Sequence, residues 1–262
     1  MPFMTPGAQP LAYTLEGAHE APVVLFSNSL GATLASWDRQ AAALAPRYRV
    51  LRYDTRGHGG SPAVPGQACT LQALGEDVLR LLDACGIERV HYCGISLGGL
   101  TGLWLAVHAP QRIERLVVAN SAARIGAEEG WRQRAAQVRA ASMAGVADGA
   151  AQRWFTPDFR AQAPGVVAGL VDGLRRCDPA GYAACCDALA GADLRADIQG
   201  IVAPTLLVAG RHDPVTTVAD AYAMRDAVKG ARCIELDASH LSNIEAEQAF
   251  TQALLDFLAG SG

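Results

Sequence analysis

The stretch that decides the fold is RVHYCGISLGG, residues 89–99. Its first part, residues 89–95, is predicted to be a short buried strand, and residues 99–108 are predicted to form an apolar helix. Between them lies the G-x-S-x-G pattern GISLG, residues 94–98. A strand that turns into a helix at one residue strains the backbone there, and side chains at the flanking positions would collide. The pattern therefore predicts a nucleophile elbow, which lifts the Ser96 hydroxyl out of the sheet.

Length and composition limit the class of protein. A chain of 262 residues, half of them hydrophobic, suits one large domain or a core with a lid. The net charge of −4 argues against a nucleic acid or an anionic membrane as a partner. No apolar stretch reaches the roughly 18 residues of a membrane span, and the N-terminal residues show no cationic segment followed by an apolar run. We therefore expect no membrane segment, no signal peptide and a cytoplasmic protein.

The seven cysteines do not form a metal or redox motif. Their number is odd, no C-x-x-C is present, and most of them lie in apolar stretches. They are predicted to be reduced and buried, as in a cytoplasmic protein, rather than catalytic. The sequence also lacks H-E-x-x-H, a Walker loop and G-x-G-x-x-G.

Strands and helices alternate over most of the chain. The predicted strands are residues 22–27, 48–53, 89–95, 115–119, 205–209 and 232–236, with a weaker edge strand at 11–15. Such alternation predicts a mainly parallel sheet with helices on both faces. The alternation stops between residues 122 and 190, where Ala-rich helical stretches follow one another. We therefore predict a core of residues 1–121 and 191–262 and a helical cap of residues 122–190. A nucleophile elbow in such a sheet is typical of the α/β-hydrolase fold, which is the fold class we predict.

The order of residues along the chain selects the partners of Ser96. In α/β-hydrolases the acid, and then the histidine, follows the serine. Asp213 follows the strand 205–209 and His240 follows the strand 232–236, so both lie at the carboxyl ends of core strands, where open α/β sheets place their sites. His240 is also the one histidine that comes after Asp213. We therefore predict Ser96 as nucleophile, His240 as base and Asp213 as the acid that orients the imidazole.

Three other residues are weaker candidates for these roles. His108 lies about 12 residues, or roughly 18 Å, along the helix that begins at Ser96, which is too far for it to act as the base. His212 would have to precede its own acid. Asp237 is a rival acid, but it comes only three residues before His240 and is poorly placed to reach the far ring nitrogen.

Two backbone amides are candidates for an oxyanion hole. The Leu97 amide lies at the N-terminus of the elbow helix, where a developing negative charge could sit. A turn after an early core strand is where this architecture places its second donor, and Leu30 is the candidate there. The alternative for Leu30 is an ordinary strand-to-helix loop, because a backbone donor places no demand on residue type.

We predict structural rather than catalytic roles for two sets of polar residues. Asp54, Arg56 and His58 follow a core strand in a turn-rich loop and are predicted to hydrogen-bond to each other and to the loop backbone. This role is favoured over a catalytic one for His58. Ser242 and Glu245 have the spacing of a capping box at the start of the last helix, residues 244–258.

Six segments carry a resemblance to known proteins. They are FSNSLGATLASWD (26–38), RYDTRGHGGS (52–61), CGISLGG (93–99), NSAARIG (120–126), RWFTPDF (153–159) and CDPAGYAACCDALAGADLR (177–195). Through them the whole chain resembles α/β-hydrolases with a helical cap, and more narrowly the 3-oxoadipate enol-lactonases of the β-ketoadipate pathway. The first three segments are shared with other branches of the superfamily, whereas the last three, in and around the cap, are more specific.

This resemblance implies hydrolysis of 3-oxoadipate enol-lactone to 3-oxoadipate in the catabolism of aromatic compounds. The reaction would pass through an acyl-enzyme and would need no metal or organic cofactor. Another serine α/β-hydrolase, such as a carboxylesterase, a perhydrolase or a carbon–carbon bond hydrolase, would use the same triad. A ligand receptor that keeps the fold is a further alternative, against which the intact set of Ser96, Asp213 and His240 argues.

The cap offers a way to recognise an anionic substrate. The implied lactone carries a free carboxylate, so its pocket is expected to offer a cation or several donors. The cap holds eight arginines and seven acidic residues, a net charge of +1, against −4 for the whole chain. Trp131 and Arg134 fall on the same face of a predicted helix, whereas Arg132 is turned away by about 100°.

Trp131, Arg134 and Trp154 are therefore the candidate substrate-binding residues, and the expected partner is a small anionic lactone. The alternative is that Trp131 packs on the core and Arg134 is solvated.

Overall fold

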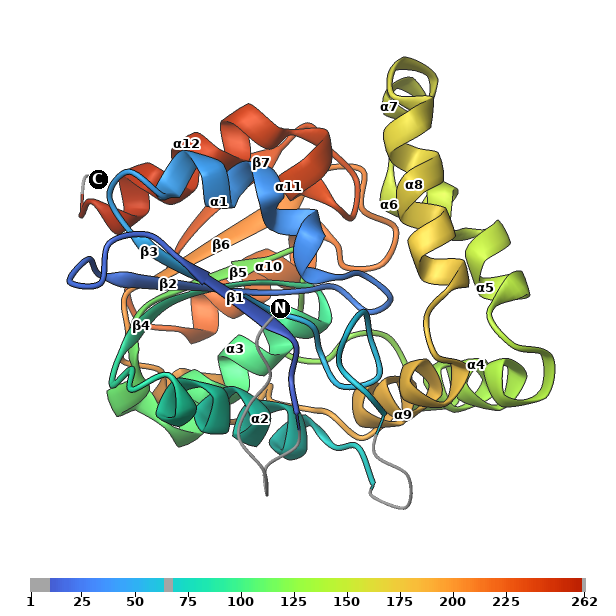
Figure 1. Ribbon diagram of the computed structural model, residues 1–262, viewed down its shortest axis with the longest axis horizontal. Helices are drawn as coiled ribbons and strands as arrows, with labels where there is room; N and C mark the ends of the chain where they lie inside the picture. The colour runs from blue at the N-terminus through green and yellow to red at the C-terminus, as the bar shows by residue number, and fades with distance from the viewer. Residues whose placement is uncertain (1–9, 64–67, 261–262) are drawn as a thin grey trace.

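Seven strands form one sheet in the computed structural model, which describes residues 10–63 and 68–260 (Figure 1). The strands are β1 (Tyr13–Glu16), β2 (Val23–Ser27), β3 (Arg49–Tyr53), β4 (Val90–Ile95), β5 (Ile113–Ala119), β6 (Thr205–Gly210) and β7 (Arg232–Leu236). Their order in the sheet is β1-β3-β2-β4-β5-β6-β7. β1 runs antiparallel to β3, and the other neighbours are parallel. The mostly parallel sheet predicted from the sequence is confirmed.

Helices cover both faces of this sheet (Figure 1). One face carries α1 (Asp38–Leu44) and α12 (Glu247–Leu258), and the other carries α2 (Leu71–Ala84), α3 (Leu97–His108) and α10 (Val218–Ala227). Trp37, just before α1, stacks on Phe26 of β2 with 4.6 Å between the ring centroids, and its ring centroid lies 5.9 Å from that of Phe250 in α12. All three rings are buried, so this aromatic cluster fixes the first helical layer to the sheet.

Six α-helices lie between β5 and β6. They are α4 (Glu128–Ala141), α5 (Ala144–Asp148), α6 (Ala150–Trp154), α7 (Pro157–Gln162), α8 (Pro164–Arg175) and α9 (Pro179–Ala190). In Figure 1 most of them stand beside the sheet, beyond its right-hand end. We call the predicted insertion, residues 122–190, the cap. Its boundaries stay a prediction.

The cap touches the core through two glycines. A Cβ atom added to Gly181 of α9 would lie 2.4 Å from the Cα of Gly57, which belongs to the loop after β3. Gly57 has a φ of +74°, a conformation that side chains disfavour, so both its backbone and its surroundings require glycine. This backbone-to-backbone approach seats α9 directly on the loop that also carries His58.

The last predicted helix is in fact two helices, and its predicted capping box is wrong. α11 (Ser242–Glu245) ends before α12 begins, and its N-cap is Leu241, whose side chain makes no capping bond. The Ser242 hydroxyl donates to Oδ1 of Asn120, and the Glu245 carboxylate accepts hydrogen bonds from Ser239 and Thr156. Ser242 and Glu245 therefore bond to other segments of the chain instead of capping the helix together.

All seven cysteines are free, as predicted; five of them are buried, and Cys85 and Cys233 are half-buried. Among the described residues, no helix combines the length and the apolar character needed to cross a membrane.

Candidate active site

Ser96 stands on a strained turn between β4 and α3. Its φ of 56° and ψ of −119° are a conformation that residues other than glycine rarely adopt. The neighbouring glycines provide the room for this turn. A Cβ atom on Gly98 would lie 2.3 Å from the carbonyl oxygen of Ser27, and one on Gly94 would lie 2.3 Å from that of Gly98. Ser96 thus has the elbow geometry that the G-x-S-x-G spacing predicts.

Asp213 and His240 meet in the buried interior beyond the ends of β6 and β7. Nδ1 of His240 lies 2.8 Å from Oδ2 of Asp213, and the exposed fractions of the two side chains are 4% and 0%. The same carboxylate accepts hydrogen bonds from the backbone amides of Val215 at 2.7 Å and Thr216 at 3.2 Å. The Thr216 hydroxyl adds a further bond to Oδ2 at 2.8 Å. The loop after β6 therefore holds the carboxylate in one orientation toward the imidazole.

The environment of Asp213 favours its charged form. Burial is the largest influence and acts to raise the pKa of this carboxyl. The charge and hydrogen bond of His240, together with hydrogen bonds from Asn120 and the Val215 amide, outweigh burial, so the pKa lies below the ordinary value of an aspartate. Asp213 can thus hold the imidazole ring and stabilise its protonated form.

The rival acid is engaged elsewhere. Asp237 accepts a hydrogen bond from Nε2 of His212 at 2.7 Å, and both side chains are more than half exposed. His108 stacks on Trp104 at the far end of α3, where its Nδ1 faces the Trp104 carbonyl oxygen at 3.0 Å. Asp237 and His108 therefore each bond to a partner other than His240.

Asn120 is a residue of this site that the sequence analysis missed. It directly follows β5, has a φ of +41°, and donates from Nδ2 to Oδ2 of Asp213 at 3.0 Å and to the carbonyl oxygen of Ser239 at 3.1 Å. Its Oδ1 accepts from the Ser242 hydroxyl at 2.5 Å. Asn120 thus links the loops that carry Asp213 and His240. Its position at the carboxyl end of a core strand was the signal available in the sequence.

Ser96 and His240 line a common cavity of about 290 Å³, which we call the catalytic cavity. Leu30 and the three predicted cap residues Trp131, Arg134 and Trp154 also line it. So do Arg153 of α6 and Tyr182 of α9, which the sequence analysis did not select. The structure thus brings the predicted nucleophile, base, loop and cap residues to one small space between core and cap.

The cap side of the catalytic cavity is cationic. The guanidinium carbon of Arg134 lies 4.9 Å from the centroid of the Trp131 ring, and both side chains are half-buried. Trp131 is held by a hydrogen bond from its Nε1 to the carbonyl oxygen of Ile125 at 2.5 Å. Arg132 is exposed and paired with Glu128, as expected for the opposite face of the helix. Arg134 and Trp131 therefore face the cavity together, rather than solvent and core separately.

A second cap arginine, Arg153, also lines the catalytic cavity. Arg153 donates from Nη2 to the carbonyl oxygen of Val146 at 2.6 Å, and burial together with the nearby charge of Arg134 lowers its pKa. Within residues 10–63 and 68–260, neither arginine has a carboxylate within ion-pairing distance, and no acidic side chain lines the catalytic cavity. Two cations without a counter-charge in the described part of the chain suit an anionic ligand.

Comparisons with known proteins agree with this geometry. Residues 22–247 match the family model described as alpha/beta hydrolase fold. The chain is 45% identical over 244 residues to "3-oxoadipate enol-lactonase 2" of Acinetobacter baylyi, covering 93% of this chain and 91% of that protein. The chain belongs to the α/β-hydrolase family and, within it, to the 3-oxoadipate enol-lactonases.

Solved structures of an enol-lactonase and of an esterase are similar in shape to this chain. The enol-lactonase from Burkholderia xenovorans LB400 superposes on this chain with a TM-score of 0.96 at 45% identity, covering 98% of this chain and 100% of that one. An esterase from Thermogutta terrifontis reaches a TM-score of 0.91 at 25% identity, with 99% and 98% of the two chains covered. As a member of this family, the chain is a hydrolase.

The oxyanion-hole candidates of this enol-lactonase family member lie beside Ser96. Leu97 is the first residue of α3, so its amide has no acceptor within the helix. Leu30 lines the catalytic cavity, and its loop is tied to the elbow by a hydrogen bond from the Gly98 amide to the Asn28 carbonyl oxygen at 3.0 Å. The donor roles of Leu30 and Leu97 stay predictions.

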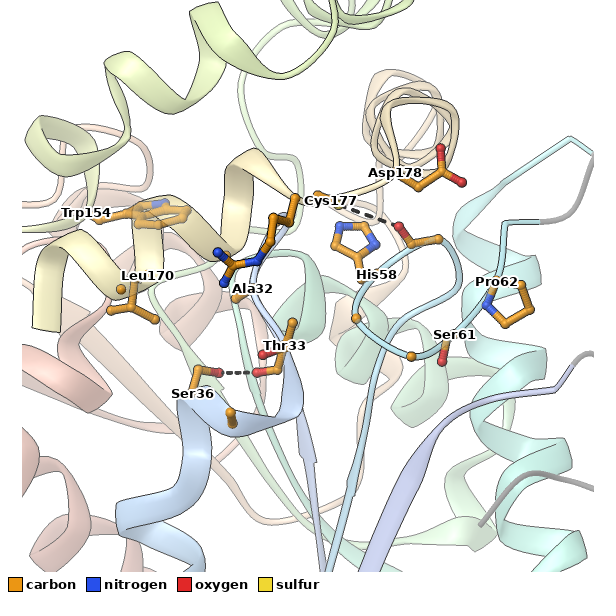
Figure 2. A pocket seen from close by; sticks show the side chains of 18 residues that line it. Ala32, Thr33, Ser36, His58, Ser61, Pro62, Trp154, Leu170, Cys177 and Asp178 are labelled. Carbon is orange, nitrogen blue, oxygen red and sulfur yellow. Dashed lines mark hydrogen bonds between the residues drawn. The ribbon is translucent and has the colours of Figure 1, made fainter. Parts of the chain in front are cut away.

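A second cavity, of about 650 Å³, lies between the loop after β3 and the cap (Figure 2). Trp154 lines both cavities, and His58 lines this one. Nδ1 of His58 faces the Arg56 carbonyl oxygen at 3.1 Å, and burial lowers the pKa of the ring, so His58 is neutral at pH 7. His58 is absent from the lining of the catalytic cavity, as expected for a structural residue.

The predicted network among Asp54, Arg56 and His58 is only partly correct. Asp54 accepts from the amides of Leu34 at 2.7 Å and Gly60 at 2.8 Å rather than from Arg56. The Arg56 guanidinium instead pairs with Asp77 of α2, with 2.5 Å between Nε and Oδ2. Asp54 and Arg56 therefore do not pair with each other but bond to separate partners.

Proposed function

We propose that this protein hydrolyses 3-oxoadipate enol-lactone to 3-oxoadipate, as a step in the breakdown of aromatic compounds in the cytoplasm. The observation that carries this proposal is the composition of the catalytic cavity. It combines Ser96 and His240 with two arginines that have no carboxylate partner among the described residues. The names of the similar proteins support the same substrate.

The proposed reaction proceeds in two steps. The Ser96 hydroxyl attacks the lactone carbonyl carbon while His240 takes its proton, and Asp213 stabilises the resulting imidazolium. The backbone amides of Leu30 and Leu97 bind the oxyanion. The ring carbon–oxygen bond then breaks, the enol oxygen receives the proton from His240, and the enol becomes the ketone. Water activated by His240 finally cleaves the acyl-enzyme and releases Ser96.

The cap arginines would bind the free carboxylate of the lactone. Arg134 lies against Trp131, which provides an apolar wall beside the charge, and Arg153 approaches from α6. The cavity volume of about 290 Å³ lies at the small end of the range for ligand pockets. This suits a compact lactone better than a long acyl chain.

Turnover of 3-oxoadipate enol-lactone, generated in situ and followed by loss of its absorbance, tests the proposal. The wild-type protein is expected to consume the lactone, and Ser96→Ala is expected to remove this activity. A parallel panel of neutral aryl esters and dienoic ketones tests for a carboxylesterase or a carbon–carbon bond hydrolase. Higher kcat/KM on that panel than on the lactone would refute the assigned substrate while keeping the triad.

A further inference from the structure

Glu245 joins the loop of the catalytic histidine to the cap. It ends α11, five residues after His240, and its two carboxylate oxygens face different segments. Oε2 accepts from the backbone amide of Ser239 at 2.7 Å, directly before His240. Oε1 accepts from the backbone amide of Thr156 at 3.0 Å and also from the Thr156 hydroxyl. One side chain therefore holds two segments that are more than 80 residues apart in the sequence.

Two further hydrogen bonds run between the same segments. The Leu241 amide donates to the carbonyl oxygen of Trp154 at 3.1 Å. The Ser239 hydroxyl lies 3.3 Å from the carbonyl oxygen of Arg153 and 3.2 Å from that of His212. The residues on either side of His240 are thus bonded to the part of the cap that carries Arg153 and Trp154, whose side chains line the catalytic cavity.

The chemistry of this junction requires a carboxylate. The Thr156 hydroxyl accepts from the Phe159 amide at 3.3 Å, as the N-cap of α7, and donates its hydrogen to Glu245. Among the described residues, the hydrogen-bond partners of Glu245 are therefore all donors, and they bond to both of its oxygens. A glutamine keeps the shape but has one acceptor oxygen, so its amide N–H would face another donor on one side.

We propose that Glu245 is a positioning residue, which sets the place of His240 relative to Arg153 and Trp154 of the cap. It acts through the Ser239 and Thr156 amides and touches no reacting atom. Displacement of the cap segment then also displaces the catalytic base. The substrate named in this inference rests on the proposed function. The link between the cap and His240 does not depend on which substrate is used.

The test compares Glu245→Gln with Glu247→Gln, a matched control two residues further on, whose side chain is 43% exposed and lies 4.0 Å from Arg39. The first readout is the rate at which a small fluorophosphonate labels Ser96, which needs the base but not the natural substrate. Glu245→Gln is expected to lower this rate and kcat roughly 10- to 100-fold, because small misplacements of catalytic groups have effects of this size. Glu247→Gln is expected to stay within about twofold of the wild type.

The substrate dependence separates positioning from simple loss of stability. In Glu245→Gln, KM is expected to rise for the carboxylate-bearing lactone and to stay nearly constant for a neutral aryl ester, because Arg153 moves with the cap segment. A second pair of variants repeats the test from the cap side. Thr156→Ser keeps the hydroxyl and is expected to match the wild type, whereas Thr156→Val is expected to lower labelling as Glu245→Gln does.

A Glu245→Gln protein that labels and turns over like the wild type, or that loses only melting temperature, overturns the inference. If Glu245→Gln does not fold, equal labelling rates for Thr156→Val and Thr156→Ser overturn it instead. Failure of the proposed function looks different: the wild type would label at Ser96 but would not consume the lactone, and the labelling comparison would still decide the role of Glu245. A wild-type protein that does not label at Ser96 would overturn both.

Discussion

Nδ2 of Asn120 lies 3.0 Å from Oδ2 of Asp213, the same oxygen that faces Nδ1 of His240 at 2.8 Å. Asn120 comes from the end of β5, Asp213 from the loop after β6 and His240 from the loop after β7. Three consecutive strand ends in the sheet therefore supply one hydrogen-bonded cluster. This arrangement explains how the fully buried carboxylate of Asp213 remains charged and directed toward His240.

Removal of the nucleophile or the base is expected to disable the enzyme. Ser96→Ala and His240→Ala are each expected to lower kcat by roughly 10³- to 10⁶-fold, and the double variant is expected to be hardly worse, because the residues act as a unit. Steady-state kinetics on the lactone measures this. Nearly wild-type turnover in either single variant would contradict the assignment.

The identity of the acid can be tested by two conservative changes. Asp213→Asn is expected to lower kcat by roughly 10⁴-fold, because an amide at this position favours the wrong tautomer of His240. Asp237→Asn is expected to have little effect on kcat, because Asp237 pairs with the exposed His212 at 2.7 Å. The reverse order of the two losses would move the acid to position 237.

Recognition of the substrate carboxylate can be tested at Arg134. Arg134→Ala is expected to raise KM for the lactone roughly 10- to 100-fold, because hydrogen bonds to charged groups are worth about 1.5–3 kcal/mol. A neutral aryl ester is expected to be almost unaffected. Arg132→Ala, on the exposed face of the same helix and paired with Glu128, is the matched control. Equal losses on both substrates would indicate disturbed packing of the cap instead of anion binding.

Two glycine substitutions are expected to change stability in opposite directions. Gly98→Ala would place a Cβ atom 2.3 Å from the Ser27 carbonyl oxygen, so we expect a loss of about 3 kcal/mol or more in the free energy of unfolding. Gly169 lies within α8, and beyond the neighbouring backbone of that helix no atom lies within 4 Å of an added Cβ, so Gly169→Ala is expected to gain about 0.4–1 kcal/mol. Urea denaturation of both variants checks the prediction, and a stable Gly98→Ala protein would argue against a rigid elbow.

Burial of His58 predicts a dependence of stability on pH. Burial holds its pKa in the folded protein below the ordinary value of 6.5, so as the pH falls the unfolded chain takes up this proton before the folded chain does. The stabilising contribution is therefore complete above pH 6.5 and is lost as the pH falls. Between pH 7 and 5.5, His58→Gln is expected to lose less of its unfolding free energy than the wild type. Equal losses in the two proteins, measured by urea denaturation at the two pH values, would contradict this prediction.

The predictable part of the site was set by local geometry and chain order. The elbow at Ser96 follows from steric limits within five residues, and the positions of Asp213 and His240 follow from the rule that parallel strands end at one edge. Asn120 was missed because its role depends on an oxygen 93 residues away. Glu245 was misassigned for the same reason: a capping box is a local pattern, whereas its actual partner Thr156 lies 89 residues earlier.

The sequence by itself determined the alternating strands and helices, the strained serine turn and the order of the predicted catalytic residues. These features depend on side-chain periodicity and on backbone sterics, which act between near neighbours. Only the tertiary structure decided that Asn120 bonds to the Asp213 carboxylate, and that Arg134 of α4 and Arg153 of α6 share one cavity with Ser96. Such contacts depend on how whole helices pack against the sheet, and no short pattern in the chain encodes that packing.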